Sequence, residues 1–110
     1  MKYLLLIYEN ENNDPGDLQP WADYTEEMGK AGVMLAGDAL LPTSSATTVR
    51  VKNGETVATD GPFAETREQL GGYYMIECAD LDEAIRWAGK MPNADRGSIE
   101  IRPVMEFDQG

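Results

Sequence analysis

The first apolar segment of the chain, residues 2–8, carries hydrophobic side chains at both odd and even positions. A strand with one face in water alternates polar and apolar residues, so this pattern predicts a β-strand covered on both faces. Three later segments are also predicted to be strands because they are apolar or alternate cleanly: residues 33–41 (with Gly37 as a bulge or a close approach), 72–79 and 98–107.

Two segments between these strands have helical spacing. The first begins near Pro20, which suits a first helical turn, and ends at Gly32, a typical helix stop. The second follows Asp80, which forms an N-terminal capping pair with Glu83. The stripes predicted to be buried are Trp21, Tyr24, Met28 and Ala31 in the first helix, and Leu81, Ala84, Ile85 and Ala88 in the second.

A β-hairpin is predicted over residues 47–59, where two alternating runs are joined by Asn53-Gly54. This dipeptide favours a type I′ turn, because both central residues of that turn need a positive φ. In the two-residue register Lys52 lies opposite Glu55. A longer connection rich in turn formers and charge follows over residues 60–72.

The element order is strand, helix, strand, hairpin, strand, helix, strand. It predicts an α+β fold, a ferredoxin-like β-α-β-β-α-β unit with an extra β-hairpin, in a single domain over residues 1–110. Two helices cover only one face of such a sheet, while strand residues on the other face are also apolar. We therefore expect a homodimer in which two sheets pack face to face. The alternative is a monomer whose segment 60–72 folds over that face.

Charge and composition narrow the functional classes. Twenty acidic and nine basic residues give a net charge of −11, which argues against nucleic acid and against anionic membrane surfaces as partners. The chain has no histidine, which excludes a Ser-His-Asp triad, a Cys-His pair and imidazole metal ligands. No segment approaches the roughly 18 apolar residues of a membrane span. The single cysteine, Cys78, lies in an apolar strand, so we expect a buried, inert thiol and a cytoplasmic protein.

Asp38 is the candidate catalytic residue. It is the only charged residue between positions 31 and 41, and a carboxylate beside apolar surface is a candidate general acid or base. The alternative is an exposed aspartate that caps backbone N–H groups at the end of a strand. No metal or other cofactor is expected, because the acidic run 9–17 lacks the ligand order of a calcium loop.

Four candidate ligand-binding residues lie in or just after the connection 60–72. Asp60 fixes a turn before Gly-Pro, and Phe63 anchors that turn in the core. Arg67, the one cation of the segment, suits a carboxylate or phosphate, and Tyr74 offers a hydroxyl to a cleft. The alternative is a rigid loop held by local ion pairs, with tyrosines that only pack.

The sequence of residues 60–74, DGPFAETREQLGGYY, resembles the signature of the DGPF proteins, a subgroup of the YCII-related family. The segments ATTVRVKNGETVATDGPF, LDEAIRWAGKMP and IEIRPVMEF are also similar, so the resemblance extends over essentially the whole chain. It implies a ferredoxin-like subunit that dimerises into an α+β barrel. Some YCII-related proteins carry a His-Asp pair in a pocket; Asp38 matches the aspartate, and this chain has no counterpart of the histidine.

Two functions follow from these observations. In the first, a small homodimer binds a small molecule or regulates a partner such as an extracytoplasmic-function sigma factor, with which DGPF-type domains are associated. In the second, it is an enzyme of the dimeric α+β barrel type. Asp38 would then transfer a proton, and Arg67 or Tyr74 would hold the substrate.

Overall fold

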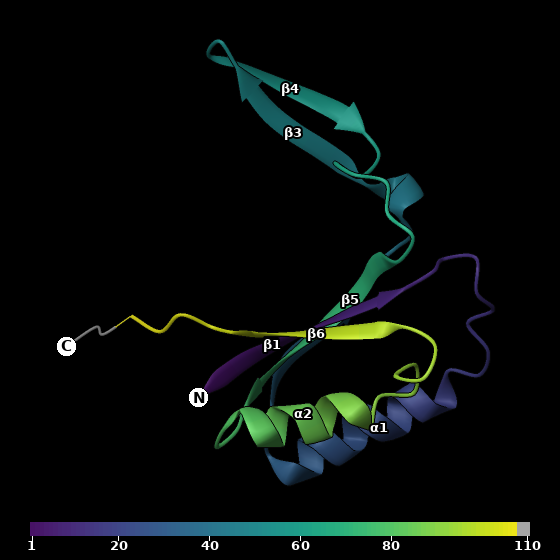
Figure 1. Cartoon of the computed structure of the whole chain (residues 1–110), viewed down its shortest axis with the longest axis vertical. Helices are drawn as coiled ribbons and strands as arrows, with labels where there is room; N and C mark the ends of the chain where they lie inside the picture. The colour runs from purple at the N-terminus through teal and green to yellow at the C-terminus, as the bar shows by residue number, and fades with distance from the viewer. Residues whose placement is uncertain (108–110) are drawn as a thin grey trace.

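Strand β1 (Lys2–Glu9) runs through the middle of a four-stranded antiparallel sheet in the computed structural model, which describes residues 1–107 (Figure 1). It pairs with β5 (Gln69–Glu77) on one side and β6 (Ser98–Pro103) on the other, and β2 (Met34–Ala39) pairs with β5. The order β2-β5-β1-β6 is that of a ferredoxin-like sheet. The predicted α+β fold is therefore confirmed.

Helices α1 (Gln19–Ala31) and α2 (Leu81–Gly89) lie on the same face of this sheet (Figure 1). Both predicted helix boundaries are confirmed by the local geometry. Gly32 ends α1 in the left-handed conformation, with φ of 73°. Asp80 accepts a hydrogen bond of 3.0 Å from the Glu83 amide, and the Glu83 carboxylate accepts one from the Ala79 amide, which completes a capping arrangement.

The core lies between the sheet and the helices. Tyr3, Leu5 and Ile7 of β1 point toward the helices and are buried, together with Tyr24 and Met28 of α1. The predicted stripes are partly wrong, because Ala31 of α1 is exposed and Leu81 and Ile85 of α2 are about half exposed. The buried side of α2 is rotated toward Ala84, Trp87, Ala88 and Met91. The Trp87 ring packs edge to face against Tyr24 at 6.1 Å and turns this side of the helix inward.

Two strand boundaries differ from the prediction by more than two residues. Strand β6 ends at Pro103 rather than at residue 107, because its partner β1 begins at Lys2 and offers no strand residues beyond that point. Strand β5 begins at Gln69, since β1 continues to Glu9 and pairs with it there. The connection between β4 and β5 therefore covers residues 61–68 rather than the predicted 60–72.

The other face of the sheet, here called the open face, carries apolar side chains that no helix covers. Leu4, Leu6 and Tyr8 of β1 and Tyr73 and Met75 of β5 lie on it and are half-buried, in contrast to the fully buried helix side. Residues 62–67 are exposed, so this segment does not fold over the sheet as the monomer alternative requires. Residues 1–107 form no closed barrel, and the homodimer stays a prediction.

Strands β3 (Thr47–Lys52) and β4 (Glu55–Asp60) form a separate two-stranded sheet, preceded by a short 3-10 helix (Thr43–Ser45). The φ values of 51° at Asn53 and 79° at Gly54 confirm the predicted turn, and Lys52 pairs with Glu55. The hairpin projects away from the helices and the main sheet (Figure 1).

Cys78 is buried as predicted, and this burial raises the pKa of its thiol. The thiolate is the reactive form, so a raised pKa lowers reactivity near neutral pH. We expect Cys78 to react with a disulfide reagent such as DTNB at least about tenfold more slowly in the native protein than in guanidinium at the same pH. Equal rates in the two states would contradict the buried position.

Candidate functional site

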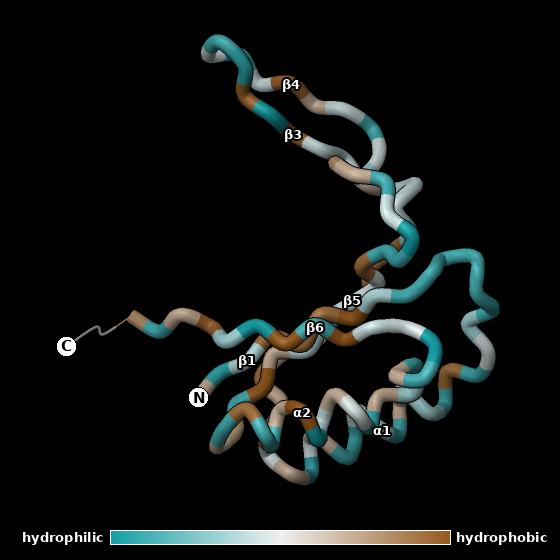
Figure 2. Tube along the Cα trace, in the orientation of Figure 1, coloured by the Kyte–Doolittle hydropathy of each residue, from teal (hydrophilic) through white to brown (hydrophobic). Residues whose placement is uncertain are grey.

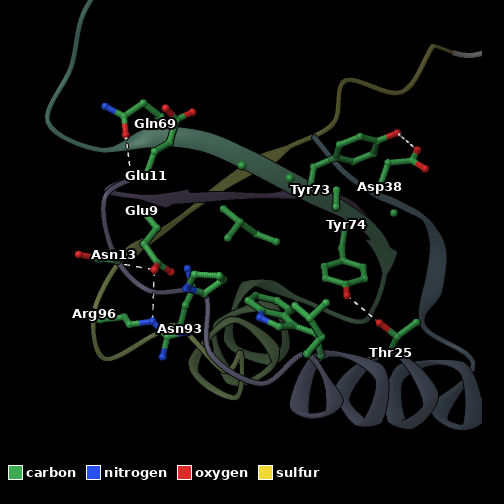
Figure 3. Close-up of a pocket in the computed structure, with 18 of the residues that line it drawn as sticks. Glu9, Glu11, Asn13, Thr25, Asp38, Gln69, Tyr73, Tyr74, Asn93 and Arg96 are labelled. Atoms are coloured by element: carbon green, nitrogen blue, oxygen red, sulfur yellow. Dashed lines mark hydrogen bonds and ion pairs between the residues drawn. The ribbon is translucent and has the colours of Figure 1, made fainter. Parts of the chain in front are cut away.

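A cavity of about 550 Å³ lies between the sheet and the first half of α1 (Figure 3). Its apolar wall comes from Ile7 of β1, Trp21 of α1 and Met34 of β2, and the loop between β1 and α1 closes one side with Pro15 and Leu18. This volume is in the range of small-molecule binding sites.

Tyr74 is held rigidly at this wall by a cluster of aromatic rings. Its hydroxyl lies 2.7 Å from the Thr25 hydroxyl, and its ring packs edge to face against Tyr24 at 5.6 Å. Gly37 of β2 makes room for the ring, because a Cβ there would lie only 2.6 Å from Tyr74 Cδ1. The predicted close approach at Gly37 is thus confirmed.

Tyr24 connects this cluster to α2. Its hydroxyl donates a 2.7 Å hydrogen bond to the Trp87 carbonyl, and burial raises its pKa, so the phenol stays neutral at physiological pH. On its other side the Tyr24 ring packs edge to face against Trp21, with 6.4 Å between the centroids. The aromatic wall is therefore built from both helices and β5.

The opposite end of the cavity is polar. Arg96 Nε lies 3.3 Å from Glu9 Oε2, and Asn13 donates to the same carboxylate oxygen at 3.5 Å (Figure 3). Asn93 also lines the cavity and is only 1% exposed, yet its side-chain oxygen has no hydrogen-bond partner among residues 1–107. An unpaired buried acceptor is costly, so Asn93 Oδ1 is the polar atom at this end of the cavity that would gain most from a hydrogen-bond donor.

The loop at the cavity mouth is fixed by Glu11. Its carboxylate accepts hydrogen bonds from the Thr43 amide at 2.7 Å and the Thr43 hydroxyl at 2.8 Å. Its own amide donates to Gln69 Oε1 at 2.9 Å. The loop over the cavity is thereby tied to the segments on both sides of the hairpin.

Comparison with known proteins places the chain in a family. A family model for the YCII-related domain matches residues 1–108. The chain belongs to the YCII-related family. An uncharacterised protein from Rhizobium meliloti (strain 1021) is 48% identical over 86 residues, which cover 76% of this chain and 67% of that protein.

A solved structure shares the fold of this YCII-related protein. It is 5-chloro-2-hydroxyhydroquinone dehydrochlorinase (TftG) from Burkholderia phenoliruptrix AC1100, in complex with 2,5-dihydroxybenzoquinone. The match has a TM-score of 0.55 and 13% sequence identity, and it covers 97% of this chain and 96% of the other. At this identity the likeness shows the fold alone.

Of the residues predicted for the site of this YCII-related protein, Tyr74 lies in the cavity wall, whereas the Asp38 side chain points to the open face. Asp38 borders the cavity, but its carboxylate is exposed and accepts a 2.7 Å hydrogen bond from the Tyr73 hydroxyl (Figure 3). This hydrogen bond raises the pKa of Tyr73. Asp38 and Tyr74 therefore lie on opposite faces of the sheet, and a catalytic role for Asp38 stays a prediction.

The other three predicted ligand residues lie outside the cavity. Asp60 ends β4, and Arg67 is exposed and forms no ion pair within residues 1–107. The expectation that Phe63 anchors the turn in the core is wrong, because Phe63 is 78% exposed. The turn is held instead by backbone contacts of Gly61 to Ala46 and Thr48, at the base of the hairpin and away from the core.

The polar end of the cavity could not be predicted from the sequence. Glu9 is far along the chain from Asn93 and Arg96, and no local spacing links it to them. Trp21 was assigned only to the core, although it also faces the cavity. Within residues 1–107 no three side chains of the metal-binding types are grouped to hold an ion, and no helix is long and apolar enough to cross a membrane.

Proposed function

We propose that this YCII-related protein binds a small, flat, neutral molecule with at least one hydroxyl group in the cavity between α1 and the sheet. The observation that carries the proposal is the unpaired, buried oxygen of Asn93 in a cavity that is otherwise largely apolar and aromatic. Such sites use apolar walls for affinity and a few polar groups for orientation.

The shape and charge of the cavity support this ligand class. Trp21 and Tyr74 offer aromatic surface for a planar ring, and a hydroxyl suits Asn93 because it can donate to the side-chain oxygen. The one cation of the lining, Arg96, is already paired with Glu9. With a chain charge of −11, a neutral ligand is favoured over an anion. The ring bound by TftG is likewise small, planar and hydroxylated.

Fluorine NMR of protein labelled with 5-fluorotryptophan tests this proposal, because the chain has only two tryptophans. Trp21 lines the cavity, whereas Trp87 packs on the other side of Tyr24. We expect catechol or hydroquinone to shift the Trp21 resonance in a saturable way and to leave that of Trp87 in place. The variants Trp21→Phe and Trp87→Phe assign the two signals.

Two outcomes of this titration would contradict the proposal. If neither resonance moves at millimolar ligand, the cavity does not accept this class of molecule. If both resonances move together without saturation, the binding is nonspecific.

A homodimer in which each protomer covers the open face of the other also belongs to this proposal. The half-buried side chains of Leu4, Leu6, Tyr8 and Met75 support it, since exposed apolar patches of this kind mark interaction surfaces. A regulatory contact with a sigma factor, membership of the DGPF subgroup, a cytoplasmic location and proton transfer by Asp38 stay predictions. Of these, catalysis by Asp38 has the least support, because the carboxylate is exposed and lies on the opposite face from Tyr74.

A further inference from the structure

The projecting hairpin of residues 47–60, here called the arm, has one face that is uncharged except at its base, where Asp60 lies opposite Thr47. Val49, Val51, Thr56 and Ala58 share that face by their register, and the two valines are 59% and 68% exposed. The charged side chains Arg50, Lys52 and Glu55 lie on the opposite face. Figure 2 shows hydrophobic residues in both strands of the arm, far from the helices and the main sheet. The arm is thus amphipathic, and its apolar face has no cover from residues 1–107.

A lone two-stranded hairpin is marginally stable in water, because it has no second layer against which to bury a hydrophobic face. Within the arm only Thr48 is half-buried, and every other residue is exposed. The sequence nevertheless specifies the arm strongly, with an Asn-Gly turn and alternating valines. A strongly specified hairpin with an apolar face needs a surface to pack against.

The overall dimensions show how much surface is unpartnered. The chain exposes 7788 Å², whereas a compact monomer of 12.1 kDa exposes roughly 6,000 Å². Its radius of gyration is 16.2 Å, against about 13 Å for a compact domain of this length. The surplus of roughly 1,800 Å² exceeds the about 800 Å² that each partner buries in a standard interface. It matches the larger area that each subunit buries in a permanent homodimer.

Charge favours a contact made by the arm. Arg50 and Lys52 balance Glu55 and Asp60, so the arm is neutral and the remainder of the chain carries the whole charge of −11. Two protomers of this charge repel each other. The neutral arm is the segment that can approach a second protomer without this electrostatic repulsion. The open face of a second copy is an apolar surface against which the arm can pack, because it presents Leu4, Leu6 and Met75.

We propose that the arm of each protomer reaches across to a second copy of the chain and lays its Val49–Val51 face on the open sheet face of that copy. The inference rests on the homodimer proposed above and adds the element that holds it together. Each six-residue strand is about 20 Å long, which is comparable to the length of β1. By twofold symmetry both arms make the same contact.

The test compares two double variants by sedimentation equilibrium. Val49→Asp with Val51→Asp places two charges on the apolar face of the arm, whereas Val57→Asp with Thr59→Asp adds the same charge on the opposite face of the arm. We expect a wild-type mass of about 24 kDa, twice the chain mass. The first variant should dissociate at least about a hundredfold more readily, and the second should behave as wild type. Far-UV circular dichroism checks that both fold.

A photo-crosslinking amino acid at position 51 gives an independent measurement. A crosslinked dimer whose bridged peptide lies in β1 or β5 supports the proposal. A wild-type protein that sediments as a monomer overturns the homodimer and the arm contact together. A wild-type dimer that the Val49→Asp and Val51→Asp changes leave equally tight, with no crosslink from position 51, overturns the arm contact alone.

Discussion

Substitution of Leu5 by alanine is expected to lower the free energy of unfolding by about 3–5 kcal/mol. Leu5 is 0% exposed and lies on the central strand β1, where it pairs with Tyr74 of β5 and Ile101 of β6. A truncation there removes packing between the sheet and both helices and leaves a cavity that paired strands cannot close. Small domains are stable by only about 5–15 kcal/mol, so this is a large fraction of the total.

Urea unfolding monitored by circular dichroism measures this loss. Leu41→Ala is the matched control, because the same change at a side chain that is 78% exposed should cost no more than about 0.5 kcal/mol. If Leu5→Ala costs no more than Leu41→Ala, the helix side of β1 is not the centre of the core.

Local pattern was sufficient to predict most of the fold. The apolar run of residues 2–8 indicated a strand covered on both faces; the helices cover one face of β1, and cover of the other face stays a prediction. The Asn53-Gly54 pair fixed the register of the hairpin, because few other sequences tolerate positive φ at both positions. Gly32 and Asp80 marked helix ends for equally local reasons.

The errors arose where distant contacts decide the outcome. The inward side of α2 depends on how Trp87 meets Tyr24, and these residues are far apart in the sequence. Phe63 was expected in the core because it is a large apolar residue after a turn, but this turn lies at the base of a projecting arm. Nothing in the sequence around Phe63 indicates that the hairpin leaves the main sheet.

The candidate site was predicted only in part for a similar reason. Neighbouring strand residues point to opposite faces, so a single position separates Gly37, beside Tyr74, from Asp38 on the open face. The pairing of β2 with β5 shifts between Met34 and Ala36. Because of this irregularity, counting alternate positions along β2 does not tell which face of the sheet a residue lies on. Tyr74 therefore lies in the cavity wall, whereas Asp38, which the enzyme hypothesis placed in the same site, lies on the other face.

Replacement of Asn93 by leucine is expected to act on binding and on stability in opposite directions. A ligand hydroxyl that loses its acceptor is left unpaired in an apolar site, which should weaken the binding of catechol or hydroquinone by about ten- to a hundredfold. The free protein meanwhile loses a buried oxygen that has no partner within residues 1–107, and leucine keeps the branched shape of asparagine. Its free energy of unfolding should stay level or rise by about 1 kcal/mol.

Calorimetric titration and urea unfolding of the same preparation separate the two effects, with Asn12→Leu as an exposed control outside the cavity. A merely structural asparagine would give the reverse pattern, because its removal would destabilise the fold and weaken binding only through that loss. If binding survives Asn93→Leu while stability falls, the buried oxygen serves the loop rather than a ligand. The proposed orientation of the ring, with its hydroxyl toward Asn93 and its face against Trp21, would then be wrong.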